Sequence, residues 1–355
     1  MIQALHLSNF RSLGEDVSIT IPEVGPHLIV LAGLNGSGKS NVLDALRFLG
    51  DAFQNGLDTA LRARGGVAQI LRRGSDSIRI AVEAAHEDVR VVWVLELALD
   101  ADGREAFSEA GAAVSGEQHE AWRETLREVR EEALANGETC GNARIHQRVI
   151  QRKMEAGDAK HALPFEGPAY WKPEGPVGGT LLLGGGNHRK QGEVLRALRG
   201  AMQSIAVYTL YPPDLRAPQP SRNTSPMDGR GADWMSALLA LGRLGMRDEF
   251  RAVMARLVPD LIDYRVNEVA GLLVPEFVHQ NRSGATWGLN TMQESDGTIR
   301  CAAMLAAMMQ EPLPFVLCLE EPELAIHVGA LPVLVDQILV TSTLTTVFVT
   351  THSPD

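Results

Sequence analysis

The residues GLNGSGKS, at positions 33–40, combine closely spaced glycines with a lysine and a serine. They fit the pattern G-x-x-x-x-G-K-[ST], in which glycines let successive backbone N–H groups converge on an anion. The lysine brings a positive charge to the β- and γ-phosphates, and the final hydroxyl can ligate Mg²⁺. We therefore predict a phosphate-binding loop for a nucleoside triphosphate, with Ser40 as a metal ligand, made by Gly33, Asn35, Gly36, Ser37, Gly38, Lys39, Ser40 and Asn41.

The flanking residues predict the elements that position this loop. An apolar run at residues 28–31 predicts a strand before it, and residues 40–53, apolar at 42, 43, 46 and 49, predict a helix after it. The N-terminus of that helix would direct its dipole at the phosphates. This order of strand, loop and helix favours a nucleotide site over a chance glycine-rich loop.

Two adjacent carboxylates follow a second predicted strand, in FVLCLEEPE at residues 315–323. At such a strand end the first acid can support Mg²⁺, and the second can orient or deprotonate an attacking water. We assign these catalytic roles to Glu320 and Glu321, with Glu320 also as a metal ligand. By itself the pair could also be a solvated acidic turn, but its combination with the phosphate loop favours catalysis.

A histidine and a serine–glycine turn are further candidates. His352 follows a predicted strand at residues 345–350 and could reach the γ-phosphate, although a histidine in this position can also be an ordinary surface residue. Ser295 and Gly297 precede an apolar helix predicted to begin near Ile299, where they could bind an anion or simply cap the helix. Their position before Glu320 favours the anion site.

The order of these motifs resembles the ABC-type ATPases of the RecF, SMC and OLD branch. The phosphate loop, S-D-G-T, E-E-P-E and T-T-H-S-P carry the resemblance, which is greatest to bacterial OLD-like AAA-family ATPases. The opening LHLSNFRSL and the segments YPPDLRAPQP and GRGADWMSALLAL support it. The resemblance implies an α/β fold: a P-loop ATPase head with a mixed central sheet, a β arm and a helical insertion.

The resemblance also implies how the head works. Two copies would pair face to face around two ATP molecules, so that Ser295 and the Gly297 N–H of one copy meet the phosphate loop of the other. Glu321 would be the catalytic base and His352 the switch histidine.

Two further residues carry over with less support. Arg11, in NFRSL, would lie near the nucleotide. Gln69 would either coordinate Mg²⁺ or be a surface side chain of its turn.

The chain departs from the family pattern at two places. Glu320 stands where many ABC ATPases have aspartate, although E-E-P-E is usual in the OLD-like branch. The element ELAIHVGAL keeps only His327 of the more typical sequence around L-H-P, so communication across the dimer could differ.

We predict three parts: residues 1–99 and 206–355 as the two halves of the ATPase head, and residues 100–205 as a helical and loop insertion, or lid. Within the insertion, residues 117–135 have helical apolar spacing and would either pack on the head or contact a partner or DNA. Residues 143–161 are the most basic stretch, and would be either a phosphate-contacting surface or a solvated helix face.

Composition limits the setting. The net charge of −11 argues against a uniformly basic surface, although a local patch for DNA is compatible with it. No apolar stretch has the roughly 20 residues of a membrane span, and no signal peptide is recognisable. Three cysteines without metal-ligand spacing, Cys140, Cys301 and Cys318, fit a reduced cytoplasm. We expect a cytoplasmic protein with no membrane partner.

The function expected from these observations is Mg²⁺-dependent ATP hydrolysis by a homodimer, coupled to DNA repair or anti-phage defence through a nuclease or another effector. Two alternatives stay open. One is a nucleotide-gated dimer switch that controls a protein partner with little turnover, and the other is the nucleotide-binding subunit of a transporter.

Overall fold

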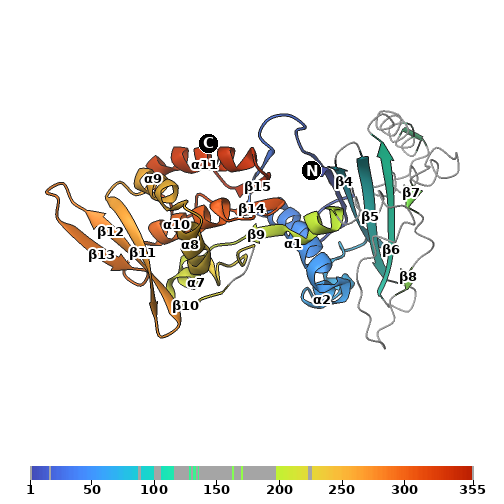
Figure 1. The fold of residues 1–355 in the computed structure, drawn as a ribbon. Helices are drawn as coiled ribbons and strands as arrows, with labels where there is room; N and C mark the ends of the chain where they lie inside the picture. The colour runs from blue at the N-terminus through green and yellow to red at the C-terminus, as the bar shows by residue number, and fades with distance from the viewer. Residues whose placement is uncertain are drawn as a thin grey trace. The chain divides into compact units, whose positions relative to one another are not determined.

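The computed structural model describes residues 2–15, 17–86, 89–99, 105–115, 128, 131–132, 135, 162–163, 169–170, 197–222 and 226–353. The chain forms two compact units, drawn in Figure 1. The first comprises Met1–Glu23 and Ser40–Gln203, and the second comprises Val24–Lys39 and Ser204–Asp355. Among the described residues, no helix has both the length and the apolar character needed to cross a membrane.

An antiparallel sheet dominates the first unit, in the order β2-β1-β4-β5-β6-β7, with β8 also paired to β6. β4 and β5 pair from Ser77↔Ala98 to His86↔Val89, which confirms the predicted β arm. The strands are β1 (Ile2–Ser8), β2 (Val17–Thr20), β4 (Ser77–His86), β5 (Val89–Leu99), β6 (Glu105–Ser115), β7 (Ala162–Leu163) and β8 (Ala169–Tyr170).

Strand β6 was not predicted, and it lies in the segment that the sequence assigned to a helical and loop insertion. Its sequence EAFSEAGAAVS is rich in small residues with low strand propensity. It nevertheless pairs with β5 over its whole length, from Leu99↔Glu105 to Val89↔Ser115. Pairing with a long neighbouring strand therefore overrides local propensity here.

The remaining predictions for the insertion fall largely outside the described residues. Of residues 117–135, only 128, 131–132 and 135 are described, and these are helical. Residues 143–161 lie outside the described part. The division of the chain at residues 99 and 205 therefore stays a prediction.

Helices of the first unit pack around aromatic side chains. The helix predicted after the phosphate loop is α1 (Lys39–Asn55), which buries Leu43, Leu46 and Phe48. Phe48 contacts Phe10 with ring centroids 6.0 Å apart. Other helical segments of this unit include α2 (Leu57–Arg62), α3 (Val67–Ile70) and residues 197–203.

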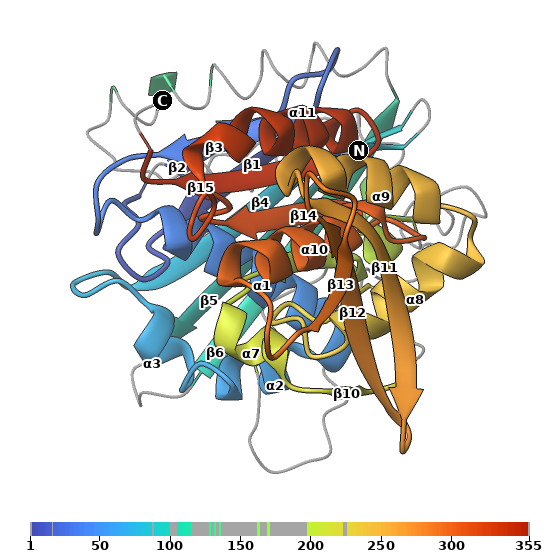
Figure 2. The same cartoon turned by 90° about the vertical axis from the view of Figure 1, so that its left-hand side faces the viewer.

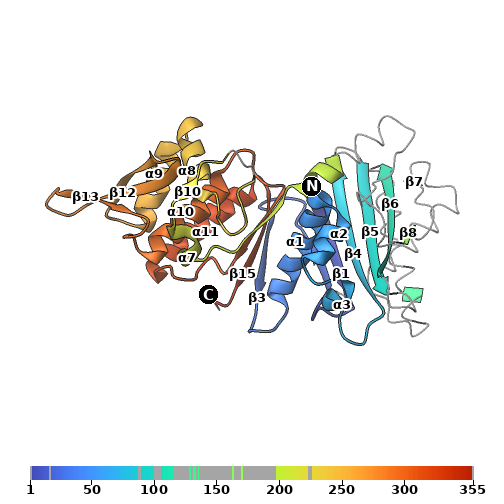
Figure 3. The same ribbon diagram turned by 90° about the horizontal axis from the view of Figure 1, so that it is seen from below.

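A parallel sheet forms the base of the second unit, in the order β3-β15-β14-β9. The strands are β3 (Leu28–Ala32), β15 (Thr346–Thr351), β14 (Val316–Glu320) and β9 (Ile205–Tyr208). Figure 3 shows β3 and β15 side by side although they come from opposite ends of the sequence. Because all four strands are parallel, their carboxyl ends meet at one edge of the sheet. β3, β14 and β15 confirm the strands predicted before the phosphate loop, before the acid pair and before His352.

A second sheet and five helices complete this unit. Antiparallel β10 (Gln219–Pro220), β12 (Leu272–Gln280), β11 (Leu261–Val269) and β13 (Thr286–Asn290) form the sheet. The helices are α7 (Pro212–Arg216), α8 (Trp234–Arg243), α9 (Arg247–Leu257), α10 (Asp296–Met309) and α11 (Leu331–Ser342), with a 3₁₀ turn at Val328–Ala330.

Helix α10 is the centre of the second unit. Every residue from Thr298 to Met309 is buried, as expected for a helix that is apolar on all sides. It contacts α7, α8, α9 and α11, which gather around it in Figure 2. The helix begins at Asp296, three residues before the predicted start, because Ser295 caps it.

Candidate active site

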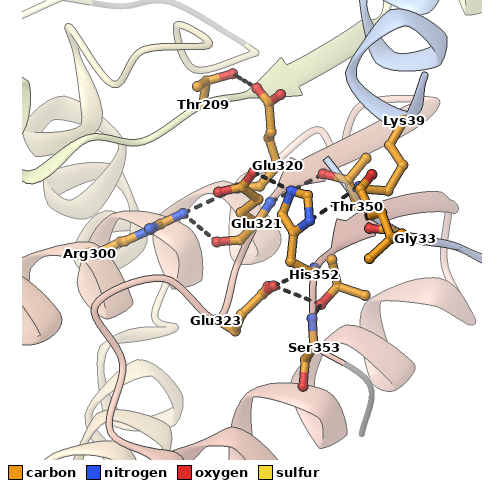
Figure 4. Close-up of polar contacts among 12 residues, drawn as sticks. Gly33, Lys39, Thr209, Arg300, Glu320, Glu321, Glu323, Thr350, His352 and Ser353 are labelled. Carbon is orange, nitrogen blue, oxygen red and sulfur yellow. Dashed lines mark hydrogen bonds and ion pairs between the residues drawn. The ribbon is translucent and has the colours of Figure 1, made fainter. Parts of the chain in front are cut away.

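The shared edge of the parallel sheet brings the chemistry-bearing residues of the second unit together (Figure 4). Gly33 follows β3 and Thr209 follows β9, while the acid pair ends β14 and His352 follows β15. Because the ends of parallel strands meet at one edge, residues almost as far apart in sequence as the chain allows become neighbours.

The phosphate loop connects β3 to α1. Gly36 and Gly38 have φ angles of 79° and 96°, in the left-handed region where glycine is favoured. The Lys39 ammonium donates to the carbonyls of Gly33 at 2.6 Å and Leu34 at 3.0 Å. Left-handed glycines beside a lysine at a helix N-terminus are the arrangement that a chain of phosphates requires, so these residues fit a nucleotide.

The two acids turn to different neighbours. Glu320 accepts a hydrogen bond from the Thr209 hydroxyl at 2.7 Å, across to β9. Glu321 donates its backbone N–H to the Thr350 carbonyl at 3.0 Å, on β15. Glu321 has a φ of 46°, a left-handed conformation that costs a residue with a side chain about 1–2 kcal/mol. The surrounding contacts must offset this strain.

His352 connects the acid pair to the phosphate loop. Its Nε2 lies 3.1 Å from a carboxylate oxygen of Glu321, and its Nδ1 lies 3.3 Å from the Lys39 ammonium. Because an ammonium group can only donate, Nδ1 is the acceptor toward Lys39, and Nε2 faces the Glu321 carboxylate. Lys39, His352 and Glu321 thus form a row of polar contacts, and the His352 and Glu321 side chains remain 35% exposed.

Glu323, the last acid of E-E-P-E, received no role from the sequence. One oxygen accepts from the Thr351 hydroxyl at 2.7 Å and from the His352 N–H at 3.0 Å. Burial opposes ionisation of this carboxyl, but hydrogen bonds from Thr351 and from neighbouring backbone N–H groups outweigh it and hold the pKa of Glu323 below its ordinary value. Glu323 therefore anchors the backbone of His352 to residues 320–325, here called the acid turn.

Arg300 is the second functional residue that the sequence analysis missed. From α10 it donates to the carbonyls of Glu321 at 2.6 Å, Leu324 at 2.9 Å and Glu320 at 3.1 Å. Burial lowers the pKa of its guanidinium, and the nearby carboxylates of Glu323 and Glu321 oppose that change. An arginine inside an otherwise apolar helix was the available signal.

A family model matches residues 28–132 and 243–355 of the chain, and its description is "AAA domain, putative AbiEii toxin, Type IV TA system". The chain belongs to this family. The match includes the phosphate loop, the acid pair and His352. None of the curated proteins compared with the chain matches it significantly in sequence.

Solved structures show the fold of this AAA-family chain. The SMC head bound to the C-winged helix domain of ScpA has a TM-score of 0.51 at 16% identity, covering 99% of this chain and 90% of that one. The SMC head of Thermotoga maritima matches with a TM-score of 0.44 and that of Pyrococcus furiosus with 0.47, each at 14% identity and covering 99% of this chain and 89% of the other. Family and fold confirm an ABC-type ATPase of the RecF, SMC and OLD branch and the predicted α/β head.

The S-D-G-T turn of the AAA-family chain has both features that the sequence left open. The Ser295 hydroxyl caps α10 by accepting the Thr298 N–H at 3.1 Å, and Ser295 itself is exposed. A Cβ added to Gly297 would lie 2.6 Å from the Ala325 carbonyl oxygen, so the glycine also permits close packing against the acid turn. The capping role is therefore observed, and the nucleotide role stays a prediction.

Polar contacts with neighbouring residues brace this turn. Arg216 on α7 donates to the Thr291 carbonyl at 2.9 Å and forms an ion pair with Asp296. Glu294 accepts the Ser295 N–H at 2.8 Å on one oxygen and lies 2.7 Å from the His279 ring on the other. The position of the exposed serine is thus fixed by the fold.

Four predicted site residues lie in the first unit. Ser40 is the second residue of α1. The Asn41 amide donates to the Ser12 hydroxyl at 2.6 Å. Gln69 is exposed on α3. Arg11, at a φ of 53°, is paired with Asp44 at 2.6 Å. Their roles toward the nucleotide stay predictions.

Within the described residues, no group of three His, Cys, Asp or Glu side chains could hold a metal by itself. Mg²⁺ usually takes one or two protein oxygens and fills its shell with phosphate oxygens and water. The predicted ligands Ser40 and Glu320 suit this mode of binding by their chemistry.

Proposed function

We propose that this AAA-family chain hydrolyses ATP with Mg²⁺ and does so as an ATP-sandwiched homodimer. The observation that carries the proposal is the row of polar contacts from Lys39 through His352 to Glu321, at the sheet edge where the phosphate loop begins. It unites a phosphate-binding cation, a switch residue and a carboxylate that can act as a base.

Each residue has a task that its position supports. ATP supplies the phosphoanhydride bond that is broken. Lys39 neutralises phosphate charge, and its present bonds to loop carbonyls are ones that phosphate oxygens would replace. Glu320 and Ser40 would hold Mg²⁺. Glu321 would orient the attacking water and accept its proton, while His352, whose Nε2 lies 3.1 Å from the Glu321 carboxylate, would help to hold the direction of that carboxylate.

The homodimer completes the site in this proposal. The exposed Ser295 hydroxyl and the N-terminus of α10 form a small donor surface on the second unit. Facing the phosphate loop of another copy, this surface would contact the γ-phosphate. A single chain would then bind ATP but hydrolyse it slowly.

The physiological task that we propose is DNA repair or defence against phage, acting through a nuclease or another effector protein. The description of the family, which names a toxin of a type IV toxin–antitoxin system, supports defence. The SMC head of similar fold was solved with a domain of ScpA, which supports a protein partner. The competing proposals are a dimer switch with little turnover and, with less support, a transporter subunit.

The test is steady-state phosphate release at several protein concentrations, with and without double-stranded DNA. Glu321→Gln is the blank, because it keeps the size of the side chain and removes the base. We expect a specific rate that rises with protein concentration and rises further when DNA is added. Chelation of Mg²⁺ should lower this rate to that of the blank.

Each arm of this test separates two proposals. A specific rate that does not depend on concentration would exclude the obligate dimer, and full activity of Glu321→Gln would place the base elsewhere. If the chain dimerises with ATP but releases phosphate no faster than the Glu321→Gln blank, the low-turnover switch would be favoured. A rate unaffected by DNA would favour an effector protein as the partner.

A further inference from the structure

Helix α10 contains one charged side chain in a fully buried apolar segment. Arg300 is 2% exposed, and its neighbours along the helix from Ile299 to Met309 are apolar and buried. Burying a guanidinium is unfavourable unless its donors are satisfied. Its hydrogen-bond partners are three backbone carbonyls, and among the described residues its Nε has no hydrogen-bond partner. Because burying the Arg300 guanidinium is unfavourable and all of its hydrogen bonds go to the turn at residues 320–324, we infer that Arg300 does more than fill space in the core.

The carbonyls that Arg300 holds belong to the acid turn. Its Nη2 donates to Glu320 and Glu321, and its Nη1 donates to Leu324. The planar guanidinium can reach several carbonyls at once because its N–H groups form a rigid fork, which a lysine ammonium on a flexible stem lacks.

Glu321 is held at both of its peptide groups. Its N–H is bonded to the Thr350 carbonyl on β15, and its carbonyl is bonded to Arg300 on α10. Between these two points the residue has a left-handed φ. With both ends fixed, the side chain leaves the backbone in one direction, toward His352 (Figure 4).

The same helix carries the S-D-G-T turn. Arg300 is five residues after Ser295, which is about 7.5 Å along a helix. Gly297, between them, packs closely against the Ala325 carbonyl of the acid turn. Two successive turns of α10 therefore touch the segment that contains Glu321, and a shift of the helix start would displace that segment.

We propose that Arg300 is a positioning residue that couples helix α10 to the orientation of the Glu321 carboxylate. Contact at the Ser295 end of the helix, including contact by a second copy of the chain, would thereby set the rate of hydrolysis at Glu321. The proposal rests on the proposed ATPase function and assigns a regulatory connection within that site.

The test compares Arg300→Met with Arg300→Lys. Methionine has a similar length and no charge, so it suits the apolar surroundings, whereas lysine keeps the charge without the fork. We expect both variants to bind ATP with a Kd within about threefold of the wild type and to lose at least about 100-fold in kcat with little change in KM. Arg256→Met, at an exposed ion pair on α9, is the control and should leave all three constants unchanged.

Two measurements separate positioning from a general loss of structure. In the Glu321→Gln background, Arg300→Met should lower the residual rate by less than about twofold, because its effect acts through Glu321. Hydrogen–deuterium exchange should become faster at the Glu321–Leu324 amides, whether or not the protein hydrolyses ATP. This second measurement tests the clamp even if the ATPase proposal fails.

Three results would overturn the proposal: kcat of Arg300→Met within about threefold of the wild type, equal losses in the wild-type and Glu321→Gln backgrounds, or unchanged amide exchange at residues 321–324. If Arg300→Met does not fold, Arg300→Lys is tested against the same three criteria.

Discussion

Two substitutions at Ser295 would separate its capping role from its proposed contact with a nucleotide. Ser295→Ala removes the oxygen that accepts the Thr298 N–H. Ser295→Asp keeps an acceptor at the cap and adds a negative charge. The backbone at Ser295 is extended, with φ −68° and ψ 150°, which is suitable for either serine or aspartate as a cap.

The expected changes in stability follow from the cap alone. Loss of an N-cap oxygen costs about 1 kcal/mol, which lowers Tm by roughly 2–4 °C in a domain of this size. Aspartate at position 295 keeps the hydrogen bond from the Thr298 N–H, and the helix dipole favours its negative charge. The neighbouring carboxylates of Glu294 and Asp296 repel that charge and reduce the gain in stability. We therefore expect Ser295→Asp to unfold at nearly the wild-type temperature.

For ATP-dependent dimerisation the order of the two variants is reversed, and we expect Ser295→Asp to lose more affinity than Ser295→Ala. A carboxylate about 4 Å from a phosphate charge, at an effective dielectric constant of about 20, is repelled by about 4 kcal/mol. This energy corresponds to a roughly 1,000-fold weakening for each of the two Ser295 contacts in the ATP-dependent dimer. Ser295→Ala loses only a hydrogen bond from an uncharged hydroxyl to the phosphate, about 1.5–3 kcal/mol, which amounts to a roughly 10- to 100-fold effect for each contact.

The assay measures Tm and the ATP-dependent dimer by sedimentation, in the Glu321→Gln background so that ATP persists. The reasoning would be refuted if Ser295→Asp dimerised as well as the parent, because Ser295 would then be a cap only. An unchanged Tm for Ser295→Ala would show that the cap contributes nothing to stability.

Three other substitutions test the remaining parts of the site. Lys39→Ala should weaken ATP binding at least about 100-fold in calorimetry while Tm stays within a few degrees, and retained affinity would remove the phosphate-loop assignment. Glu323→Gln should lower the free energy of unfolding by about 1–3 kcal/mol at neutral pH, because a charged acceptor of the Thr351 hydroxyl is lost. Since the folded pKa of Glu323 is depressed, its contribution is complete above its ordinary pKa of about 4.3 and lost as pH falls through the folded value, so chemical denaturation should show the two proteins converging in acid. Gly297→Ala should cost about 1–3 kcal/mol without nucleotide, because its Cβ would meet the Ala325 carbonyl oxygen at 2.6 Å, and an unchanged unfolding midpoint would contradict that contact.

The parts of the site that depend on local sequence were predictable. The phosphate loop, the acid pair and His352 each follow an apolar run that became β3, β14 or β15. Parallel strands place such carboxyl ends at one edge, so the proximity of these motifs also follows once the fold class is known.

Arg300 and Glu323 could not be found in this way because their partners are remote or are backbone groups. Arg300 bonds carbonyls twenty or more residues further along the chain, and any residue type supplies a carbonyl. Glu323 is defined by a hydroxyl and an N–H at the end of β15. Spacing within one motif contains no information about either set of contacts.

The start of α10 and the existence of β6 were missed for different reasons. Apolar periodicity finds the buried part of a helix, whereas the first turn of α10 is polar and is defined by its cap. Strand β6 has little strand propensity of its own and exists through pairing with β5. Both errors come from reading a segment without its neighbours.

The pairing of β3 with β15 has a consequence for the synthesis of the protein. β3 lies at the edge of its sheet, and its only partner there among the described strands is β15, which follows it across nearly the whole length of the chain. A nascent chain on the ribosome therefore holds its phosphate loop on an unpaired strand until residues 346–351 emerge. Closing so long a loop is entropically costly and slow. A translation product that stops before β15 would thus leave β3 without this partner, and ATP affinity would distinguish such a product from chains that include residues 346–351.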